Sequence, residues 1–353
     1  MKTVRDINLK NKIVLVRTDY NVPIEDGKIT SDLRIRASLP TLEYLKEKGA
    51  KKIIVISHLG RPEGKRVKEL SLKPVANHLK TLLPDANINF VDDVSGPDVE
   101  DAVEKLKTGS ILLLENLRFY PGEEKNSDNF IEEIVDSTGA EIFVQDGFAV
   151  VHRAHASVDA VSRLLPVVAG LLLEKEVEGL ESALNEPKKP FTVVIGGSKV
   201  EDKQPLIDKF LKKADKIIVG GKIAADGYQP TDKKIYVAED FDEDGSGTKL
   251  DVGPLSCAKI ADMLADSKTV LWNGLMGKAE DPAYATASTI VAKLLGEKTD
   301  INSIICGGDT TGFVEELMQE DPNLSFSLIS TGGGAALEFL LGNFLPGLEV
   351  IEV

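Results

Sequence analysis

Short runs of hydrophobic, largely β-branched residues alternate with amphipathic stretches through the first half of the chain. Such runs, each followed by a helical repeat of apolar positions, are typical of buried parallel strands and the helices that connect them. The pattern therefore predicts βαβ units around a parallel sheet. Strands are expected at 12–16, 52–57, 88–93, 111–116 and 141–146, and helices at 32–48, 72–83, 99–105 and 129–137.

The second half repeats this alternation, but its strand-like runs end in small or polar residues. A helical pattern follows each run, so the same architecture is expected with different loops. The predicted fold class is α/β, with two Rossmann-like domains that each place a parallel sheet between two layers of helices (three-layer α/β/α). The runs are FTVVIGGSK (191–199), KIIVGGK (216–222), TVLWNG (269–274), SIICGGDT (303–310) and FSLISTGGG (326–334).

The stretch 166–190 is the predicted joint between the two domains, and it is expected to contain a helix because its apolar residues from Leu171 to Leu184 recur near helical spacing. Residue chemistry changes across it: all nine arginines and all four histidines lie at or before Arg163, whereas twenty-one of the thirty glycines follow it. We therefore expect two domains that hold two different anionic ligands. The predicted boundaries are an N-terminal domain at 1–169, a hinge helix at 170–187 and a C-terminal domain at 188–341.

Length and charge narrow the class of protein. A chain of 353 residues suits two domains of common size. A net charge of −15 argues against nucleic acid or an anionic membrane as partner, since both require a basic surface. The charged start, MKTVRDINLK, lacks the apolar core of a signal peptide, and Cys257 and Cys306 have no metal-binding spacing. A cytoplasmic enzyme with reduced thiols is expected.

Basic side chains follow the strand-like runs of the first half. Because ligands bind parallel sheets at the carboxyl ends of the strands, these side chains should converge on one crevice. So many positive charges in one small crevice repel one another unless an anion binds there. Asp19 and Asn21 could accept a hydroxyl of that anion, and Arg34 opens the first helix beside it. The converging residues are Arg17, Arg61, Arg118 and Arg153, joined by His58 and His152.

Glycine turns in the second half suit a larger phosphate ligand. The turn Gly196–Lys199 leads into a helix that carries Lys203, so Lys199 and Lys203 should share the positive N-terminal end of that helix. The segment Gly307–Thr310 offers backbone N–H groups and one carboxylate, Asp309, which could hold a phosphate-bound Mg²⁺. The triplet 332–334 provides a third approach to phosphate oxygens.

Familiar nucleotide signatures are absent from the sequence, which has no GxxxxGK[ST], no GxGxxG after a strand and no HRD…DFG set. Two alternatives stay open on the residues alone. A two-domain NAD-dependent dehydrogenase would share the sheets and the hinge, although it should carry the missing GxGxxG. A non-catalytic anion-binding hinge protein would explain the arginines, but not Asp309 beside a glycine turn.

The ordered set of motifs resembles the phosphoglycerate kinase family over essentially the full length. Leu275, Cys306 and the segment 147–151 depart from the family's usual WNGP, GGGDT and AFG patterns. The matching motifs are RTDYNVP (17–23), ITSDLRIRASLPT (29–41), SHLGRP (57–62), LLENLRF (113–119), QDGFAVVHRAH (145–155), GGSKVEDK (196–203), DVGP (251–254), WNGLMG (272–277), GGDT (307–310) and STGGGAALEFL (330–340).

This resemblance implies a site in each domain. It also implies that a C-terminal tail at about 342–353 returns to the first domain, that the protein is a monomer, and that Glu280 takes the ribose hydroxyls and Asp309 the magnesium. The implied 3-phosphoglycerate pocket comprises Asp19, Asn21, Arg34, His58, Leu59, Gly60, Arg61, Arg118, His152 and Arg153. The implied nucleotide side comprises Lys199, Lys203, Gly253, Glu280, Gly307, Gly308, Asp309 and Thr310.

The implied reaction is reversible phosphoryl transfer between 1,3-bisphosphoglycerate and MgADP, which gives 3-phosphoglycerate and MgATP. In the reverse direction the nucleophile is a carboxylate that is already ionised at neutral pH, so no general base is needed. Positioning and cationic stabilisation should then supply most of the catalysis. We assign Arg34 and Lys199, one from each domain, to the charge on the transferring phosphoryl group.

Overall fold

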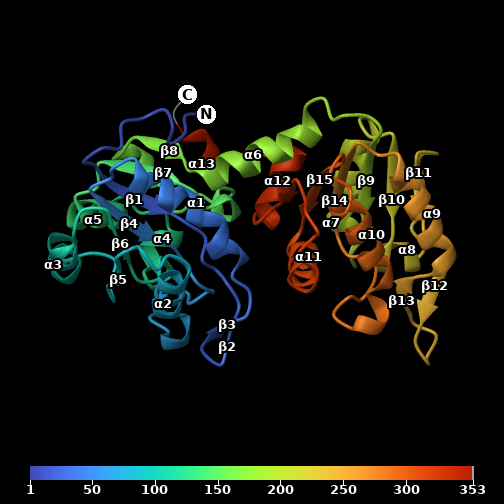
Figure 1. Ribbon diagram of the computed structural model, residues 1–353, viewed down its shortest axis with the longest axis horizontal. Helices are drawn as coiled ribbons and strands as arrows, with labels where there is room; N and C mark the ends of the chain where they lie inside the picture. The colour runs from blue at the N-terminus through green and yellow to red at the C-terminus, as the bar shows by residue number, and fades with distance from the viewer. Residues whose placement is uncertain (352–353) are drawn as a thin grey trace. The chain divides into compact units, whose positions relative to one another are not determined.

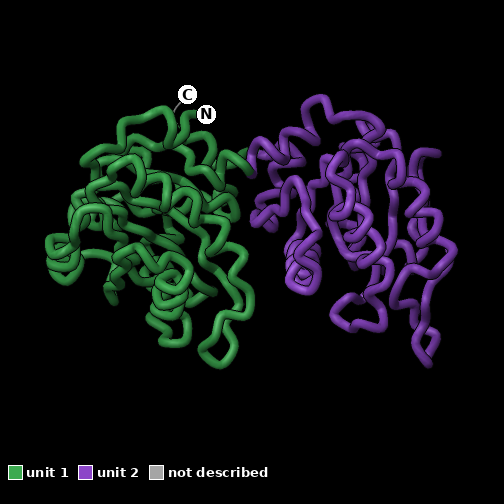
Figure 2. The backbone as a smooth tube through the Cα atoms, in the orientation of Figure 1, with its two compact units in different colours: residues 1–175, 344–353 green, residues 176–343 purple. Residues whose placement is uncertain are grey.

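The computed structural model describes residues 1–351, which form two compact units (Figure 2). Unit 1 holds residues 1–175 together with the chain from Phe344 onward, and unit 2 holds Glu176–Asn343. The division falls inside helix α6 (Leu171–Leu184). Of the tail predicted at 342–353, the last two residues lie outside the described part of the chain.

Unit 1 is built on a six-stranded parallel sheet in the order β5-β6-β4-β1-β7-β8 (Figure 1). Its strands are β1 (Ile13–Arg17), β4 (Lys52–Ile56), β5 (Ile88–Phe90), β6 (Ser110–Leu113), β7 (Ile142–Gln145) and β8 (Val167–Ala169), with a small hairpin of β2 (Ile24–Glu25) and β3 (Lys28–Ile29). Its helices are α1 (Leu33–Glu47), α2 (Lys73–Leu82), α3 (Pro97–Lys105), α4 (Pro121–Glu124), α5 (Asp128–Thr138) and α13 (Pro346–Glu349), with short 3-10 helices at Lys68–Leu70, Leu117–Phe119, Phe148–Val150 and Ala160–Arg163.

Unit 2 has its own six-stranded parallel sheet in the order β11-β10-β9-β14-β15-β16. The strand order reverses between β9 and β14, as in dinucleotide-binding folds. Its strands are β9 (Phe191–Ile195), β10 (Lys216–Val219), β11 (Ile235–Val237), β14 (Thr269–Asn273), β15 (Asn302–Cys306) and β16 (Leu328–Ile329), with a hairpin of β12 (Phe241–Glu243) and β13 (Lys249–Val252). Its helices are α7 (Val200–Leu211), α8 (Gly221–Ala225), α9 (Pro254–Ala265), α10 (Thr286–Gly296), α11 (Gly308–Glu320) and α12 (Gly334–Leu341), with a 3-10 helix at Pro282–Tyr284.

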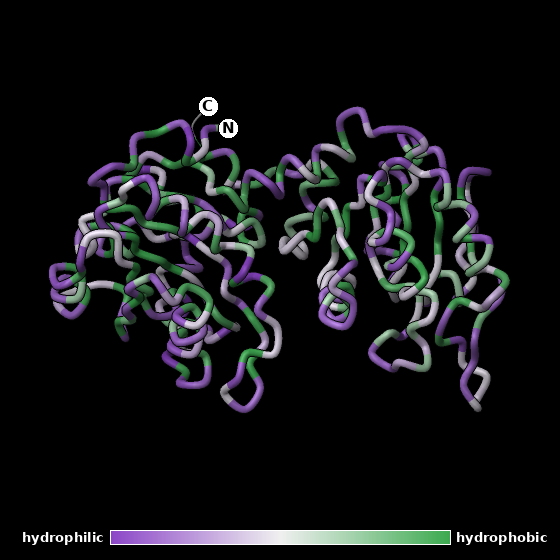
Figure 3. Tube along the Cα trace, viewed as in Figure 1, coloured by the Kyte–Doolittle hydropathy of each residue, from purple (hydrophilic) through white to green (hydrophobic). Residues whose placement is uncertain are grey.

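The α/β class with two Rossmann-like parallel sheets is confirmed. In each sheet the central strands are buried on both faces, which explains why they read as continuous apolar runs rather than as alternating ones. Figure 3 shows hydrophobic segments along these strands within each unit. Within residues 1–351 there is no helix with the length and apolar character needed to cross a membrane.

The joining stretch 166–190 is only partly helical, and its helix α6 lies within the predicted hinge helix at 170–187. Val167–Ala169 forms the edge strand β8, which pairs in parallel with β7, and the Pro166 carbonyl accepts a hydrogen bond from the Phe143 N–H at 3.0 Å. Two adjacent valines favour an extended backbone, and the helix begins only after Gly170. A run of three residues is too short for hydrophobic spacing to separate strand from helix.

The last described segment of the chain packs within unit 1. The Gly347 N–H donates to the Val151 carbonyl at 2.9 Å, and a Cβ on Gly347 would lie 2.8 Å from a methyl group of Val158. Figure 1 shows α13 beside β8, near the N-terminus. Unit 1 is therefore assembled from two separate segments of the chain.

A buried carboxylate holds the beginning of α6. Asp146 follows β7 and is fully buried, and its Oδ1 accepts hydrogen bonds from the Thr41 hydroxyl at 2.8 Å and the Leu172 N–H at 3.1 Å. A Cβ on Gly170 would lie 2.0 Å from this oxygen, so only glycine leaves room for the contact. Burial raises the pKa of Asp146 to about 7.

This raised pKa predicts a specific pH dependence of stability. The folded chain retains the Asp146 proton between about pH 4 and pH 7, where the unfolded chain has lost it. The stabilisation from Asp146 should therefore fall as pH rises through this window and stay level above it. Relative to Asp146→Asn, the free energy of unfolding of the natural chain should drop by up to about 4 kcal/mol across the window, at about 1.4 kcal/mol per pKa unit. Denaturant unfolding at several pH values measures this, and a constant difference between the two chains would contradict it.

Candidate functional site

The loops after β1, β4, β6 and β7 lie at the same edge of the unit 1 sheet, because all four strands are parallel. The strand order changes direction at β1, between β4 and β7, which is where parallel sheets open a crevice for ligands. These loops carry the predicted residues at 19–21, 57–61, 115–118 and 146–153.

Asp19 and Arg34 form an ion pair at this edge. The Arg34 Nη1 lies 2.6 Å from the Asp19 Oδ2 and 3.2 Å from the Asn21 carbonyl oxygen. Asp19 is almost fully buried, whereas the Arg34 side chain keeps 28% of its surface exposed. Asp19 therefore orients a cation that solvent, or a ligand, can still reach.

Two asparagines hold the loop Leu59–Arg61. Asn21 accepts the Gly60 N–H through its side-chain oxygen at 2.8 Å, and Asn116 donates to the Leu59 carbonyl at 2.7 Å. Gly60 has a φ of +64°, and a Cβ there would lie 2.7 Å from Leu70. The loop is thus fixed in a conformation that requires glycine, and it leaves Arg61 exposed.

Arg118 and Arg153 bring positive charge to the same loops. Arg118 is buried and donates to the Gly60 carbonyl at 2.9 Å, and its pKa is lowered to about 10 by burial and by the nearby charges of Arg17 and Arg153. Arg153 is half-buried, and its Nε donates to the Nε2 of His152 at 3.1 Å. A bound anion would stabilise these cations, because it would offset their mutual repulsion.

Arg17 differs from its prediction, because its guanidinium is completely buried rather than open to the crevice. Its Nη2 lies 3.1 Å from the Nδ1 of His58, which is also buried. The pKa of His58 lies well below its usual value because of burial, and the charges of Arg17, Arg118 and Arg34 lower it further. His58 is therefore a neutral imidazole at neutral pH.

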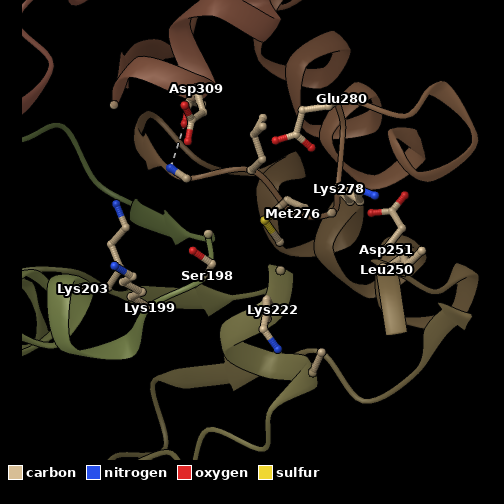
Figure 4. A pocket seen from close by; sticks show the side chains of 18 of the residues that line it. Ser198, Lys199, Lys203, Lys222, Leu250, Asp251, Met276, Lys278, Glu280 and Asp309 are labelled. Carbon is tan, nitrogen blue, oxygen red and sulfur yellow. Dashed lines mark hydrogen bonds between the residues drawn. The ribbon is translucent and has the colours of Figure 1, made fainter. Parts of the chain in front are cut away.

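Unit 2 contains a cavity of about 380 Å³ at the carboxyl ends of β9, β10, β14 and β15, where the strand order reverses (Figure 4). The Lys199 and Lys203 side chains lie together, and Asp309 and Glu280 lie across the cavity from them. Of the residues predicted for the nucleotide side, the cavity is lined by Lys199, Lys203, Glu280, Gly307, Gly308, Asp309 and Thr310.

Glycine lets the loops of this cavity come into direct backbone contact. The Gly197 N–H donates to the Leu275 carbonyl at 2.8 Å, and a Cβ on Gly274 would lie 2.2 Å from the Gly196 carbonyl oxygen. The Gly274 N–H in turn donates to the Thr310 hydroxyl at 2.8 Å. Thr310 therefore joins two loops, and its hydroxyl is already engaged as an acceptor.

Helix α11 points its N-terminus into the cavity. Its N-cap, Gly307, has a φ of +98° and supplies no side chain to the first N–H groups of the helix, which leaves them for a ligand. Asp309 in the first turn is exposed. Lys203 is largely buried, hydrogen-bonds the Asn273 side chain, and has a pKa lowered by burial.

Two predicted groups lie outside the lining of this cavity. Gly253 is the N-cap of α9, and a Cβ there would lie 2.5 Å from Asp240. Gly332 and Gly333 precede α12, which begins at Gly334, and the Gly332 N–H donates to the Ser330 hydroxyl. Leu250 and Asp251, which precede Gly253 in the chain, do line the cavity.

Sequence reasoning missed one wall of the cavity, which comprises Lys222, Phe241, Lys249 and Lys278. The Lys249 ammonium lies 4.7 Å from the centre of the Phe241 ring, across the β12–β13 hairpin. The acidic run at 240–244 is typical of a surface loop, so its composition does not reveal the hairpin. The alternation of Phe241 with acidic residues was the only available signal.

Comparison with known proteins agrees with the order of the motifs. The family model described as phosphoglycerate kinase matches residues 4–229 and 225–343. A phosphoglycerate kinase from Coxiella burnetii is 34% identical, with 99% of this chain and 98% of that chain covered and a TM-score of 0.78. One from Pyrococcus horikoshii OT3 is 28% identical at the same coverage, with a TM-score of 0.86.

The backbone contact at Gly274 predicts a large effect of one methyl group. Gly274→Ala places a Cβ 2.2 Å from a carbonyl oxygen at a φ of +100°, so it should lower the free energy of unfolding by at least the roughly 1–3 kcal/mol of backbone strain. Gly312→Ala is the matched control, because Gly312 lies inside α11 with open space around it and should gain roughly 0.5–1 kcal/mol. Denaturant unfolding compares them, and equal effects would contradict the close approach.

Proposed function

This chain belongs to the phosphoglycerate kinase family, and on that premise we propose that unit 1 binds the phosphoglycerate and unit 2 the nucleotide. The family's reaction is the glycolytic transfer of a phosphoryl group between 1,3-bisphosphoglycerate and ADP, which gives 3-phosphoglycerate and ATP. The observation that carries the assignment of unit 1 is the gathering of Arg34, Arg118 and Arg153 at one sheet edge.

In unit 1, Arg61, Arg118 and Arg153 are proposed to bind the phosphate of 3-phosphoglycerate. Arginine suits this task because its planar fork donates two hydrogen bonds to phosphate oxygens at once. Asp19 and Asn21 are proposed to position the hydroxyl end, and His58 and His152 complete the pocket with Leu59 and Gly60. The exposed face of Arg34 supports its approach to the reacting group.

In unit 2, the nucleotide phosphates are proposed to bind the open N–H groups of α11 with Lys199 and Lys203, while Glu280 binds the ribose. A phosphate-bound Mg²⁺ needs only one or two protein carboxylates, and the exposed Asp309 at the helix start fits that need. Within residues 1–351 no three His, Cys, Asp or Glu side chains form a metal site. The magnesium would neutralise phosphate charge, and the protein residues would orient the nucleotide.

The acceptor carboxylate of 3-phosphoglycerate is ionised at neutral pH, so no residue has to remove a proton. Positioning and charge stabilisation therefore carry the catalysis, with Arg34 from unit 1 and Lys199 from unit 2 on the transferring phosphoryl group. Two half-sites on separate units must meet before reaction and must exclude water that would hydrolyse the acyl phosphate. We propose that bending about α6 brings them together.

One assay tests the function. The protein is mixed with 3-phosphoglycerate and MgATP, and release of ADP is followed. ADP release that depends on 3-phosphoglycerate is expected. A dehydrogenase or a non-catalytic anion-binding protein would release no ADP, and the family membership disfavours both alternatives.

A monomer in the cytoplasm is proposed, and the two buried free thiols support a reducing compartment.

Removing the Lys199 cation should separate binding from chemistry. Lys199→Ala should leave 3-phosphoglycerate binding nearly intact but reduce turnover by roughly 10² or more, since it removes charge from the transition state. Lys259→Ala is the control, because Lys259 is also exposed but lies on α9, outside the cavity lining. Steady-state kinetics and calorimetric binding measure the two effects. Unchanged turnover would remove Lys199 from the mechanism.

Arg34 has a control two positions away. Arg34→Ala should reduce kcat by roughly 10² or more, because Arg34 is proposed to stabilise the transferring charge. Arg36→Ala removes a guanidinium that is 60% exposed and paired only with Asp32 on the surface, so kcat should stay within about twofold. If the two variants have equal kcat in the same assay, Arg34 does not bridge the substrates.

A further inference from the structure

Unit 1 buries a carboxylate that the mechanism above does not use. Glu123 lies in α4 and has no exposed surface. Burial of a carboxylate costs several kcal/mol unless partners satisfy it, so a buried glutamate beside a ligand site requires an explanation. Its partners lead directly toward the residues that are proposed to bind 3-phosphoglycerate.

The first partner of Glu123 is Ser157, which donates a hydrogen bond to each of the two carboxylate oxygens. The Ser157 hydroxyl donates to Oε1 at 2.6 Å, and the Ser157 N–H donates to Oε2 at 3.0 Å. The hydroxyl proton is therefore committed to Glu123, and the hydroxyl oxygen is free to accept. It accepts the Nε–H of Arg17 at 2.8 Å.

Arg17 extends this connection to His58. Its Nη1 hydrogen-bonds the Thr18 carbonyl, and its Nη2 lies 3.1 Å from the Nδ1 of His58. A guanidinium can only donate, so Nδ1 must be the acceptor. The imidazole is neutral, and its proton is therefore on Nε2. Asp19 lies 3.7 Å from the same Nδ1, too far for a hydrogen bond.

Glu123 also balances the positive charge of Arg17. Arg17 is fully buried, and the nearby carboxylates that favour its charge are Glu123 and Asp19. Asp19 is already paired with Arg34 at 2.6 Å. Glu123 is thus the carboxylate left to balance Arg17, which otherwise adds to the repulsion that Arg118 experiences.

We propose that Glu123 is a positioning residue for the substrate site: through Ser157 it fixes the Arg17 guanidinium, which in turn holds His58 as the Nε2–H tautomer. This proposal rests on the proposed place of His58 in the 3-phosphoglycerate pocket. The Nε2–H of His58 is then a neutral hydrogen-bond donor, and the positive charge of Arg17 is balanced within the protein by Glu123. His155, whose Nδ1 lies 3.8 Å from Glu123, packs beside the same carboxylate.

The tautomer is measured directly in the natural chain. With ¹⁵N-labelled histidine at pH 7 and no substrate, His58 should show a protonated Nε2 and a bare Nδ1, and its signals are assigned by their loss in His58→Gln. An Nδ1–H tautomer, or an imidazolium, would overturn the proposal. This measurement needs no variant of Glu123 to fold, and it is independent of catalysis.

The variants test the connection. Glu123→Gln keeps the size of the side chain but removes its charge, and its amide can accept only one of the two hydrogen bonds that Ser157 donates. Ser157→Ala removes the intermediate hydroxyl. Both should shift the His58 nitrogen signals toward a mixture of tautomers and raise the KM for 3-phosphoglycerate roughly ten-fold or more, as the loss of a hydrogen bond to a charged group does. The KM for MgATP should stay within about twofold. Glu123→Asp, which keeps the charge, should recover part of both effects.

The control is Glu132→Gln, because Glu132 is exposed on α5 and should change none of these readings. Unchanged His58 signals in folded Glu123→Gln and Ser157→Ala would overturn the proposal, as would equal rises in both KM values. Failure of the proposed function is distinguishable: His58→Gln would then bind 3-phosphoglycerate normally, while the His58 signals of the other variants would still shift.

Discussion

Positive charge that is crowded at the carboxyl end of a parallel sheet is the constraint on which unit 1 depends. Parallel strands force the loops that follow them to one edge, and three of those loops deliver cations there. The protein does not cancel all of this charge. Asp19 pairs with Arg34 and Glu123 balances Arg17, whereas burial, together with the charges of Arg17 and Arg153, lowers the pKa of Arg118 to about 10. The remaining charge is what a multiply charged anion would neutralise.

Unit 2 forms its cavity with close backbone contacts as well as with charged side chains. Its loops approach so closely that Gly196, Gly221 and Gly274 have no space for a side chain. The cavity presents the N–H groups at the start of α11 together with five lysines, and both kinds of group are suited to phosphate oxygens. The two units share a fold class and differ in the residues that follow their strands.

Hydrophobic patterning predicted the sheets well, because strands that are buried on both faces leave a strong apolar signal. It could not predict β8, whose three residues carry too little pattern, or the hairpin wall around Phe241. The candidate site residues could be proposed from the sequence because arginines and glycines directly follow the strands. Arg17 was misjudged since a strand-end arginine looks the same in sequence whether it faces a ligand or an interior carboxylate. That difference depends on Ser157 and Glu123, which are 140 and 106 positions away in the chain.

Unit 2 is continuous in sequence, but unit 1 is not, because residues from Phe344 onward belong to it. During synthesis, all of unit 2 (Glu176–Asn343) therefore leaves the ribosome before the segment of unit 1 that begins at Phe344. Until then Val151 and Val158 lack the Gly347 backbone that covers them, and an apolar surface stays open on the nascent protein. The N-terminal half of this chain thus begins folding first and finishes last.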